Sequence, residues 1–567
     1  MPATLLALLV AAAAPAAFEI RMGSGEQDLA QYKEYGYNVA VIGSFTQLAT
    51  YAGIAPEALP AGSPLRATVE DHRRRMRETL RQAAALGLKA CLSTDEILLP
   101  TAVLQHFGSR IARDDDPERV DLAKEQFWEV YRAKYREVLR EFPEIAYVMV
   151  RTGENYAFQL NGYTGQLIAE RTSATTRTEE YFRNMRRLIE ETRRVVVDEF
   201  GRTLIWRTWD LGNYGFHAST PVYDRIIGSL PNRKGMIFSI KFTQTDYWRY
   251  NDFNPQIGRG GVDQIVEFQC AREYEGKGAF PVYAGEEHAA AMRRARQLRV
   301  KGVWIWNFGG GWGGPHLKSD RWVRLNIEAT ARLARNPDLE PRKLAEEWAA
   351  REFGKRAARR VAGMLMLSDD CVLKFRYIAP FARRNKGWLP SRNIMRDDII
   401  RGEKALGNEG GLKILYEGSK HALEEAFAEK REAVTLAARM RKLFEGARGA
   451  ITDERRYEEA RNSLLYMESL ATVMSHYIQG MFRYYRWKET GQAETGRTAL
   501  EHLRRWRQAW SRYQSEIGQL AGVATLYRSQ NSQRDTDTAG AMADTCETAL
   551  KELSAAYTRS GTTNGAR

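Results

Sequence analysis

Residues 236–274, which read MIFSIKFTQTDYWRYNDFNPQIGRGGVDQIVEFQCAREY, decide the fold of this chain. Residues 236–242 and 264–270 are short apolar runs with the composition of buried strands. A loop rich in Asp, Asn, Tyr, Trp and Gly separates them. At or just after the ends of the two runs lie Lys241, Asp246, Glu267, Gln269 and Glu273. In a parallel α/β barrel this edge of the strands carries the chemistry, whereas the alternative is a pair of ordinary surface loops.

Similar apolar runs alternate with helical patterns from residue 18 to residue 308. The eight predicted strands are residues 18–24, 37–44, 89–96, 145–154, 203–210, 236–242, 264–270 and 302–308. The helical patterns include residues 69–87, 122–142 and 178–200, with apolar side chains at i, i+3, i+4 and i+7. This alternation predicts an α/β fold, a (β/α)8 TIM barrel. A doubly wound open sheet is the alternative, but MGSGEQ after the first strand matches its glycine-rich phosphate turn poorly.

The pattern changes near Pro341, after which we find helical periodicity and no convincing strand. The helical segments are residues 341–354, 355–375, 421–447, 454–489 and 497–520. Glycines such as Gly354 and Gly491 separate them. We therefore predict a barrel over residues 17–338 and an all-α C-terminal domain over residues 339–567.

The first residues, MPATLLALLVAAAAPAA, resemble a secretory signal peptide spanning residues 1–16 and cleaved near Ala16. A periplasmic or secreted protein is the expectation that follows. The stretch has no Lys or Arg near its start, so a misassigned start codon or a buried first helix is the alternative. It is too short to span a bilayer convincingly and no later stretch could, so we expect no membrane partner after cleavage.

The composition includes 85 Lys and Arg against 71 Asp and Glu, a formal net charge of +14. These basic residues are spread through helical patterns, which predicts a solvated basic surface rather than a nucleic-acid partner. The four cysteines are far apart and have no metal-ligand spacing: Cys91, Cys270, Cys371 and Cys546. We therefore expect neither a bound metal nor a cofactor, and disulfides are possible but not required.

Polar and aromatic residues gather at the ends of the later predicted strands and in the loops that follow. Besides Lys241, Asp246, Glu267, Gln269 and Glu273, they are Arg151, Glu154, Tyr156, Arg207, Trp209, Trp306, Asn307, Trp312 and His316. All of them except Glu154, Asp246 and Glu273 are candidates for substrate binding. Glycoside hydrolysis needs one carboxyl group that protonates the leaving oxygen and a carboxylate that activates water or attacks the sugar. Aromatic rings stack on sugars, and Arg or Lys binds a carboxylate. No G-x-S-x-G motif occurs, so the pattern favours hydrolysis of an acidic sugar over a serine hydrolase.

Several of these motifs follow one another in a known order. A strand ends in Lys241, Asp246 follows five residues later, and then come EFQ at 267–269 and EY at 273–274. GGWGGPHLKSDRW at 310–322, IWRTW at 205–209 and VRTGEN at 150–155 add to the pattern. In these motifs the chain resembles the α-glucuronidases of glycoside hydrolase family 67.

The resemblance implies that Glu154 is the general acid and that Asp246 and Glu273 polarise the attacking water, with inversion at the anomeric carbon. It implies that Lys241 and Arg207 hold the uronate carboxylate. The implied activity is an exo-acting α-glucuronidase that removes (4-O-methyl-)glucuronic acid from acidic oligosaccharides such as xylan fragments. A homodimer through the helical domain is implied as well.

The sequence departs from the family in three places. The turn after Lys241, residues 242–245, and the surroundings of Glu154 differ from the family pattern. The family's N-terminal β-sandwich domain has no counterpart before the first predicted strand, so we expect a distant relative. The resemblance therefore supports the family's fold for this chain more strongly than it supports the family's substrate.

Structural roles are the alternatives for the candidate residues. Glu154 could form a salt bridge, Asp246 and Glu273 could bond to loops, and Arg207 could pair with Asp210 or Glu267. We expect Glu267, inside an apolar strand, to orient Lys241 or Arg207 rather than to act directly.

Other roles also stay open. His316 could bond to a loop, and Asp95 and Glu96 could contact substrate or cap a helix. In each of the pairs Trp206/Trp209 and Trp304/Trp306, we expect one ring to face the barrel and the other to pack under helices. A retaining glycosidase that uses Glu154 and Glu267, or a non-catalytic carbohydrate-binding barrel, are the competing functions.

Overall fold

The fold is described from a computed structural model. The residues described are 18–26, 28–155, 157, 160–168, 177–210, 215–308, 320–385, 409–517, 520 and 533–559. The predicted signal peptide, residues 1–16, lies outside these ranges.

Eight parallel strands close into a barrel in the order β1-β10-β9-β8-β7-β5-β3-β2. They are β1 (Ile20–Ser24), β2 (Val39–Ser44), β3 (Lys89–Asp95), β5 (Ile145–Arg151), β7 (Thr203–Arg207), β8 (Met236–Lys241), β9 (Gln264–Gln269) and β10 (Gly302–Trp306). Each lies within one of the eight predicted runs, so the predicted TIM barrel is confirmed. The structure adds a small antiparallel sheet of β4 (Leu98–Pro100) and β6 (Tyr163–Gly165), which we did not predict.

The alternation of side chains along each strand decides what faces the barrel interior. Ile205, Ile237, Ile265 and Trp304 belong to the cluster inside the barrel. Because side chains alternate with a period of two, residues two or four positions further along the same strands face the barrel mouth. These inward positions near the strand ends are Arg207, Ser239, Lys241, Glu267, Gln269 and Trp306.

This period corrects one expectation about the tryptophans. Trp304 and Trp306 lie two residues apart, so both face the interior, and Trp306 packs against the inner cluster. The expectation that one of them packs under helices was therefore wrong. Trp206 does pack in the outer core beneath the helices, whereas Trp209 contacts Lys241 beyond the strand end.

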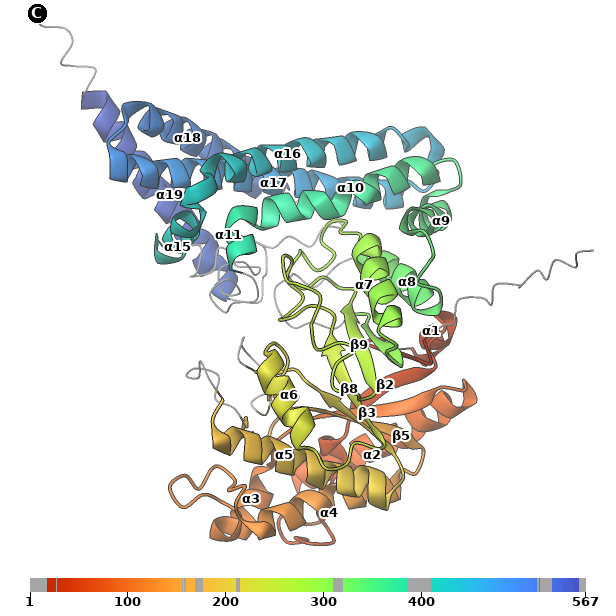
Figure 1. Cartoon of the computed structure of the whole chain (residues 1–567). Coiled ribbons are helices and arrows are strands. Elements are labelled where there is room, and N and C mark those ends of the chain that lie inside the picture. Colours follow the sequence, from red (N-terminus) through yellow and green to blue (C-terminus); the bar gives the residue numbers. More distant parts are fainter. Residues whose placement is uncertain are drawn as a thin grey trace, which may run out of the picture.

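In the part of the chain described, eight helices accompany the barrel strands (Figure 1). They are α1 (Leu29–Glu34), α2 (Pro64–Ala85), α3 (Thr101–Phe107), α4 (Glu125–Glu141), α5 (Glu179–Arg193), α6 (Thr220–Ser229), α7 (Gly285–Gln297) and α8 (Arg321–Arg335). Local sequence explains two starts: Pro64 occupies the first turn of α2, and the Thr178 hydroxyl accepts a hydrogen bond from the backbone of Tyr181 in α5. The predicted helices at 69–87, 122–142 and 178–200 correspond to α2, α4 and α5, the last continued by a π-helical turn, Arg194–Glu199.

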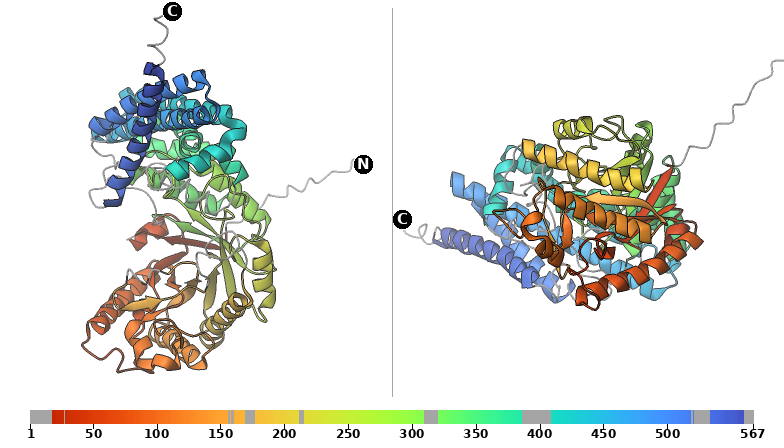
Figure 2. Two further views of the ribbon diagram at one scale, coloured as in Figure 1. Left: turned by 90° about the vertical axis from the view of Figure 1, so that its left-hand side faces the viewer. Right: turned by 90° about the horizontal axis from the view of Figure 1, so that it is seen from below.

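The chain after α8 is helical and contains no strand within the ranges described. Its helices are α9 (Pro341–Phe353), α10 (Ala358–Arg376), α11 (Ala379–Arg384), α15 (Glu409–Ser419), α16 (Leu423–Glu445), α17 (Glu454–Thr490), α18 (Ala493–Ser515) and α19 (Gln533–Arg559). The 37-residue α17 ends at Thr490 and is capped by Gly491, whose φ of +66° favours glycine. Figure 2 shows this helical region stacked on one end of the barrel, and one continuous apolar core joins the two.

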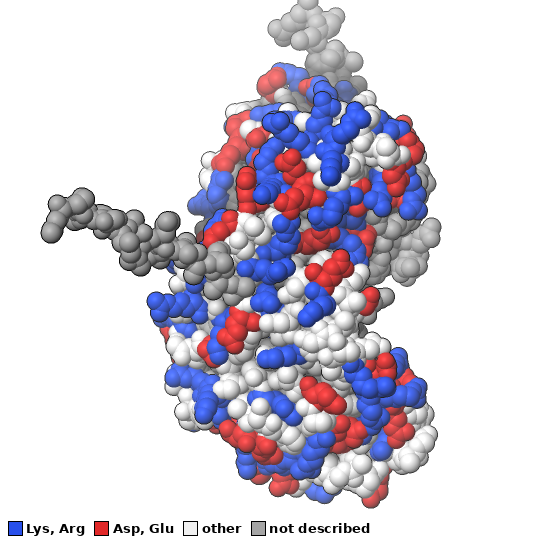
Figure 3. All heavy atoms as spheres, turned by 90° about the vertical axis from the view of Figure 1, so that its right-hand side faces the viewer, with Lys and Arg blue, Asp and Glu red and all other residues white. Residues whose placement is uncertain are grey.

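On the face shown in Figure 3, basic and acidic residues are interspersed over both the barrel and the helical region. All four cysteines are buried, and none of them forms a disulfide. Among the helices described, none has the length and apolar character needed to cross a bilayer. In the same ranges no three His, Cys, Asp or Glu side chains gather as metal ligands would.

Candidate active site

A buried ion pair forms the floor of the barrel mouth. Arg207 at the end of β7 donates two hydrogen bonds to Glu267 of β9, at 3.0 and 2.9 Å, and Ser239 donates a third at 2.9 Å. Burial alone would raise the pKa of Glu267, but the Arg207 guanidinium, with Lys241 and Ser239, brings it below the ordinary value. Glu267 therefore orients Arg207, as we expected from its position in an apolar strand.

Aromatic rings surround the two cations at this rim. The Arg207 guanidinium lies 4.7 Å from the ring centre of Trp304 and 4.8 Å from that of Trp306. The Lys241 ammonium lies 3.4 Å from the ring centre of Trp209 and 4.9 Å from that of Tyr247. Such rings stabilise a desolvated cation and also offer flat faces to a sugar.

Asp246 is held in a fixed position next to Lys241. Its Oδ1 atom accepts hydrogen bonds from the Lys241 ammonium at 2.5 Å and from the Tyr247 backbone at 2.9 Å. The Tyr274 hydroxyl donates to Oδ2 at 2.6 Å. The Asp246 side chain is only 5% exposed, so its orientation is set by these donors rather than by solvent.

Glu273 lies in the loop after β9 and forms a reciprocal pair with Gln269. The Gln269 amide nitrogen donates to Glu273 Oε1 at 2.9 Å, and the Glu273 backbone donates back to Gln269 Oε1 at 2.9 Å. Both residues are buried. Gln269 therefore orients a predicted catalytic carboxylate, a role that its place among the predicted substrate-binding residues did not anticipate.

Glu154 belongs to a second charged group, at the end of β5. Arg151 donates to Glu154 at 2.6 Å and to both oxygens of Asp95 at 2.7 Å. The structure therefore contains the salt bridge that was the alternative role for Glu154. A general acid must carry a proton, so Glu154 would have to exchange this contact for one with the leaving oxygen.

A cavity of about 320 Å³ at the barrel mouth connects the two charged groups. Its lining includes Asp95, Arg151, Arg207, Trp304, Ser44, Gln47, Ser93 and Thr94. Two guanidinium groups thus line one cavity, and each is paired with carboxylates, Arg151 with Asp95 and Glu154 and Arg207 with Glu267. A larger cavity of about 580 Å³ lies outside the barrel beside α5. The predicted catalytic residues Glu154, Asp246 and Glu273 line neither cavity.

No protein-family model matches this chain, and no curated protein sequence does. Similar solved structures exist. A GH138 enzyme targeting pectin rhamnogalacturonan II matches with a TM-score of 0.61 and 11% identity over 91% of this chain. A family 89 glycoside hydrolase from Clostridium perfringens matches with a TM-score of 0.54 and 11% identity over 95% of this chain.

The chain spans 64% of the length of each of these two proteins. At this level of identity the likeness establishes the fold alone, a barrel followed by a helical region. The resemblance to family 67 and the roles it implies stay predictions.

The other predicted site residues fall into two groups. Asn307 is fully buried, where its amide donates to Glu26 at 2.9 Å and accepts from the Tyr37 hydroxyl at 2.9 Å, so both ends already have protein partners. Three further predicted residues lie outside the residues described: Tyr156, Trp312 and His316.

Several residues at the site were missed by the sequence reasoning. Tyr274 was visible only as the second half of a Glu-Tyr pair and Tyr247 only as an aromatic residue of the loop, whereas Trp304 was considered only for the direction of its ring. Asp95, left open between a substrate contact and a helix cap, pairs with Arg151 at the cavity. Its neighbour Glu96 is buried and bonds to Lys134 at 2.6 Å instead of capping a helix.

His217 was also missed, and it lies beside the same charged groups. It is fully buried, with its ring between the Thr208 hydroxyl at 2.9 Å and the Thr243 carbonyl at 3.2 Å. Burial, together with the charge of Lys241, lowers the pKa of His217 to about 4. His217 is therefore neutral at pH 7.

Proposed function

We propose that this protein is a glycoside hydrolase that acts on acidic oligosaccharides. The observation that carries the proposal is the cavity lined by Arg151 and Arg207 at the C-terminal rim of a (β/α)8 barrel. In that architecture the rim is where active sites are built. Both solved structures reported above are glycoside hydrolases, which supports the same reaction class.

The proposed chemistry divides the rim between binding and catalysis. The cations Arg207 and Lys241 bind the substrate carboxylate, and the nearby tryptophans stack on the sugar ring. Glu154, next to the cavity residue Arg151, gives its proton to the leaving oxygen. Asp246 and Glu273 orient and deprotonate the attacking water, so the product forms with inverted configuration.

The finer proposal is an exo-acting α-glucuronidase related to family 67 that removes (4-O-methyl-)glucuronic acid from fragments such as those of xylan. It depends on the sequence motifs around Lys241, Asp246 and Glu273. Pectin fragments belong in the same substrate panel, because a structural neighbour targets pectin rhamnogalacturonan II. A periplasmic or secreted location and a homodimer are part of this proposal.

The retaining alternative needs Glu267 as a nucleophile. Glu267 is fully buried and occupied by two hydrogen bonds from Arg207 and one from Ser239. An attacking carboxylate needs access to the anomeric carbon, so this arrangement counts against Glu267 as the nucleophile.

The experiment is a product screen with glucuronoxylan oligomers, pectin fragments and neutral oligosaccharides, using wild type and Glu154→Gln. Uronic acid release by wild type, abolished in the variant, would support the proposal. NMR of the first product would show inversion or retention, and retention would remove Asp246 and Glu273 as water activators. Binding without turnover across the panel would favour a non-catalytic carbohydrate-binding barrel.

A further inference from the structure

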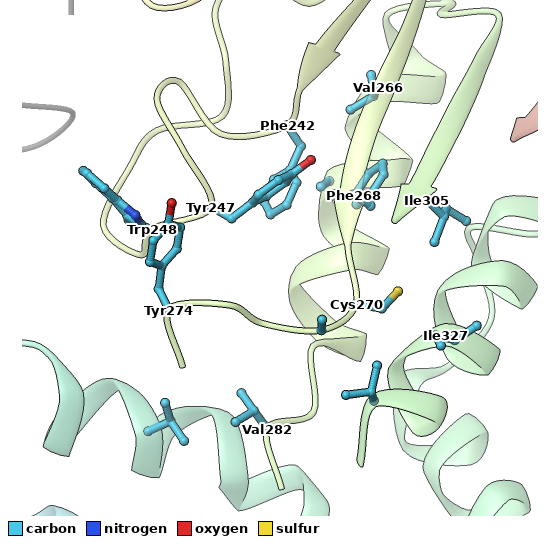
Figure 4. Close-up of a cluster of buried hydrophobic side chains, with 14 of the residues drawn as sticks. Phe242, Tyr247, Trp248, Val266, Phe268, Cys270, Tyr274, Val282, Ile305 and Ile327 are labelled. Atoms are coloured by element: carbon cyan, nitrogen blue, oxygen red, sulfur yellow. The ribbon is translucent and has the colours of Figure 1, made fainter. Parts of the chain in front are cut away.

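The loops that carry Asp246 and Glu273 extend away from the barrel toward the helical region. In Figure 1 the loops after β8 and β9 lie between the barrel and α10. Figure 4 shows Trp248 of one loop facing Tyr274 of the other, and their ring centres lie 5.5 Å apart at nearly right angles. Neither loop forms a helix or a strand over its central part. Backbone hydrogen bonds such as that from Gln244 to Asp252 hold part of each loop, and side-chain contacts hold the rest.

Helix α10 supplies those contacts through Ser368, Asp369 and Arg376, and the adjoining Tyr377 adds another; we call these four residues the α10 clamp. Asp369 accepts two hydrogen bonds from Arg249, at 2.5 and 2.7 Å. Ser368 accepts one from the backbone of Tyr283 at 2.9 Å. These bonds hold one loop at Arg249, three residues after Asp246, and the other at Tyr283, where it leads into α7.

The most direct connection runs through Arg376. Its Nε atom donates to the backbone carbonyl of Tyr274 at 2.7 Å, and the hydroxyl of the same tyrosine donates to Asp246 at 2.6 Å. Arg376 is fully buried and Tyr274 is 1% exposed. A buried cation that bonds to the backbone next to Glu273 fixes both predicted water-activating residues at once.

A charge network, buried at Arg272 and Glu275 and half-buried at Arg249 and Glu287, also joins the two loops. Glu287 of α7 pairs with Arg249 at 3.2 Å and with Arg272 at 2.7 Å. Arg272 also donates to Glu275 at 2.6 Å, and Tyr377 donates to the same carboxylate at 3.3 Å. Arg272 has a φ of +55°, a conformation unusual for this residue type, which the surrounding contacts maintain next to Glu273.

We infer that helix α10 positions the catalytic carboxylates of the barrel, so that the helical region is part of the framework of the active site and not only a surface for dimerisation. Arg376, Asp369 and Tyr274 are positioning residues in this scheme. The catalytic part of the inference depends on the proposed function. The mechanical part, that α10 orders the two loops, does not.

The first test uses the proposed activity. Tyr274→Phe keeps the ring against Trp248 but removes the bond to Asp246, so kcat is expected to fall about 10- to 100-fold with KM little changed. The acid limb of the pH–rate profile is expected to move to higher pH, because a carboxylate that loses a donated hydrogen bond is protonated more easily. An unchanged profile and kcat would overturn the positioning role of Tyr274.

Arg376 is tested by a conservative pair. Arg376→Met removes the donor to Tyr274, whereas Arg376→Lys keeps a cationic donor and is expected to restore part of kcat. The matched control is Glu459→Gln, which alters another contact between the barrel and the helical region, Arg321 with Glu459 at 2.9 Å, far from the loops in sequence. Equal losses in Arg376→Met and Glu459→Gln would contradict the inference.

The second test does not require a known substrate. Hydrogen–deuterium exchange is measured on peptides covering residues 242–252 and 270–279 in wild type, Arg376→Met, Asp369→Asn and Glu459→Gln. Faster exchange in Arg376→Met and Asp369→Asn but not in Glu459→Gln supports the α10 clamp, even if wild type hydrolyses no substrate. Absence of hydrolysis by wild type would refute only the proposed function. Unchanged exchange in all variants would refute the inference whatever the activity.

Discussion

Replacing Glu267 by glutamine tests the ion pair at the floor of the barrel mouth. The Glu267 side chain is 0% exposed and the Arg207 side chain is 5% exposed, and the two share a bidentate contact. The substitution therefore leaves Arg207 buried without its counter-charge. Removing one partner of a buried pair costs about 3–5 kcal/mol, and glutamine has nearly the same shape, so no cavity adds to the loss. We expect the free energy of unfolding at pH 7 to fall by that amount in urea denaturation followed by tryptophan fluorescence.

A matched control separates burial from geometry. Arg136 and Glu199 form the same bidentate contact, at 2.7 Å for both bonds, but their side chains are 30% and 29% exposed. Glu199→Gln is therefore expected to cost about 1 kcal/mol or less. Equal losses in the two variants would mean that burial does not set the strength of the Arg207 pair, and the reasoning would be wrong.

The pH dependence of this difference has a definite sign. The pKa of folded Glu267 lies below the ordinary value, so its ionised form stabilises the fold above the unfolded pKa of about 4.3. That contribution is lost as the pH falls through the folded pKa. The gap between wild type and Glu267→Gln is thus expected to be constant near neutral pH and to shrink only below about pH 4.

Three further outcomes are expected. Lys241→Met raises KM for uronides about 10- to 100-fold and leaves KM for neutral glycosides nearly unchanged, because only the former offer a carboxylate; equal effects on both would refute the carboxylate contact. Glu154→Gln lowers kcat at least about 100-fold on substrates with poor leaving groups while binding persists, and wild-type kcat in this variant would exclude Glu154 as the acid. The pKa of His217 is lowered to about 4 in the folded state, so as the pH falls the unfolded state binds a proton first. The free energy of unfolding of wild type therefore falls more steeply between about pH 6.5 and pH 4 than that of His217→Asn. Urea denaturation midpoints measured across this range check the difference.

The positions of the strands could be predicted because burial of a strand or helix shows directly in the local pattern of apolar residues. Each barrel strand is covered on both faces and therefore reads as a short apolar run, and each barrel helix shows an apolar stripe. The same pattern indicated the change to helices near Pro341 and showed that Lys241, Glu267 and Gln269 lie at strand ends. The period of two along a strand was also available, and applying it to Trp304 and Trp306 would have avoided one error.

The sequence by itself determined the barrel, the helical region and the edge of the barrel at which charged residues gather. Tertiary structure alone decided the partners: Arg207 meets Glu267 across 60 residues and Arg376 meets Tyr274 across 102. Periodicity records only whether a side chain is buried, whereas the choice among several buried acids and bases depends on distances set by the closing of the barrel and the packing of α10. For the same reason the sequence offered Asp210 and Glu267 equally to Arg207, and only the folded chain selected Glu267.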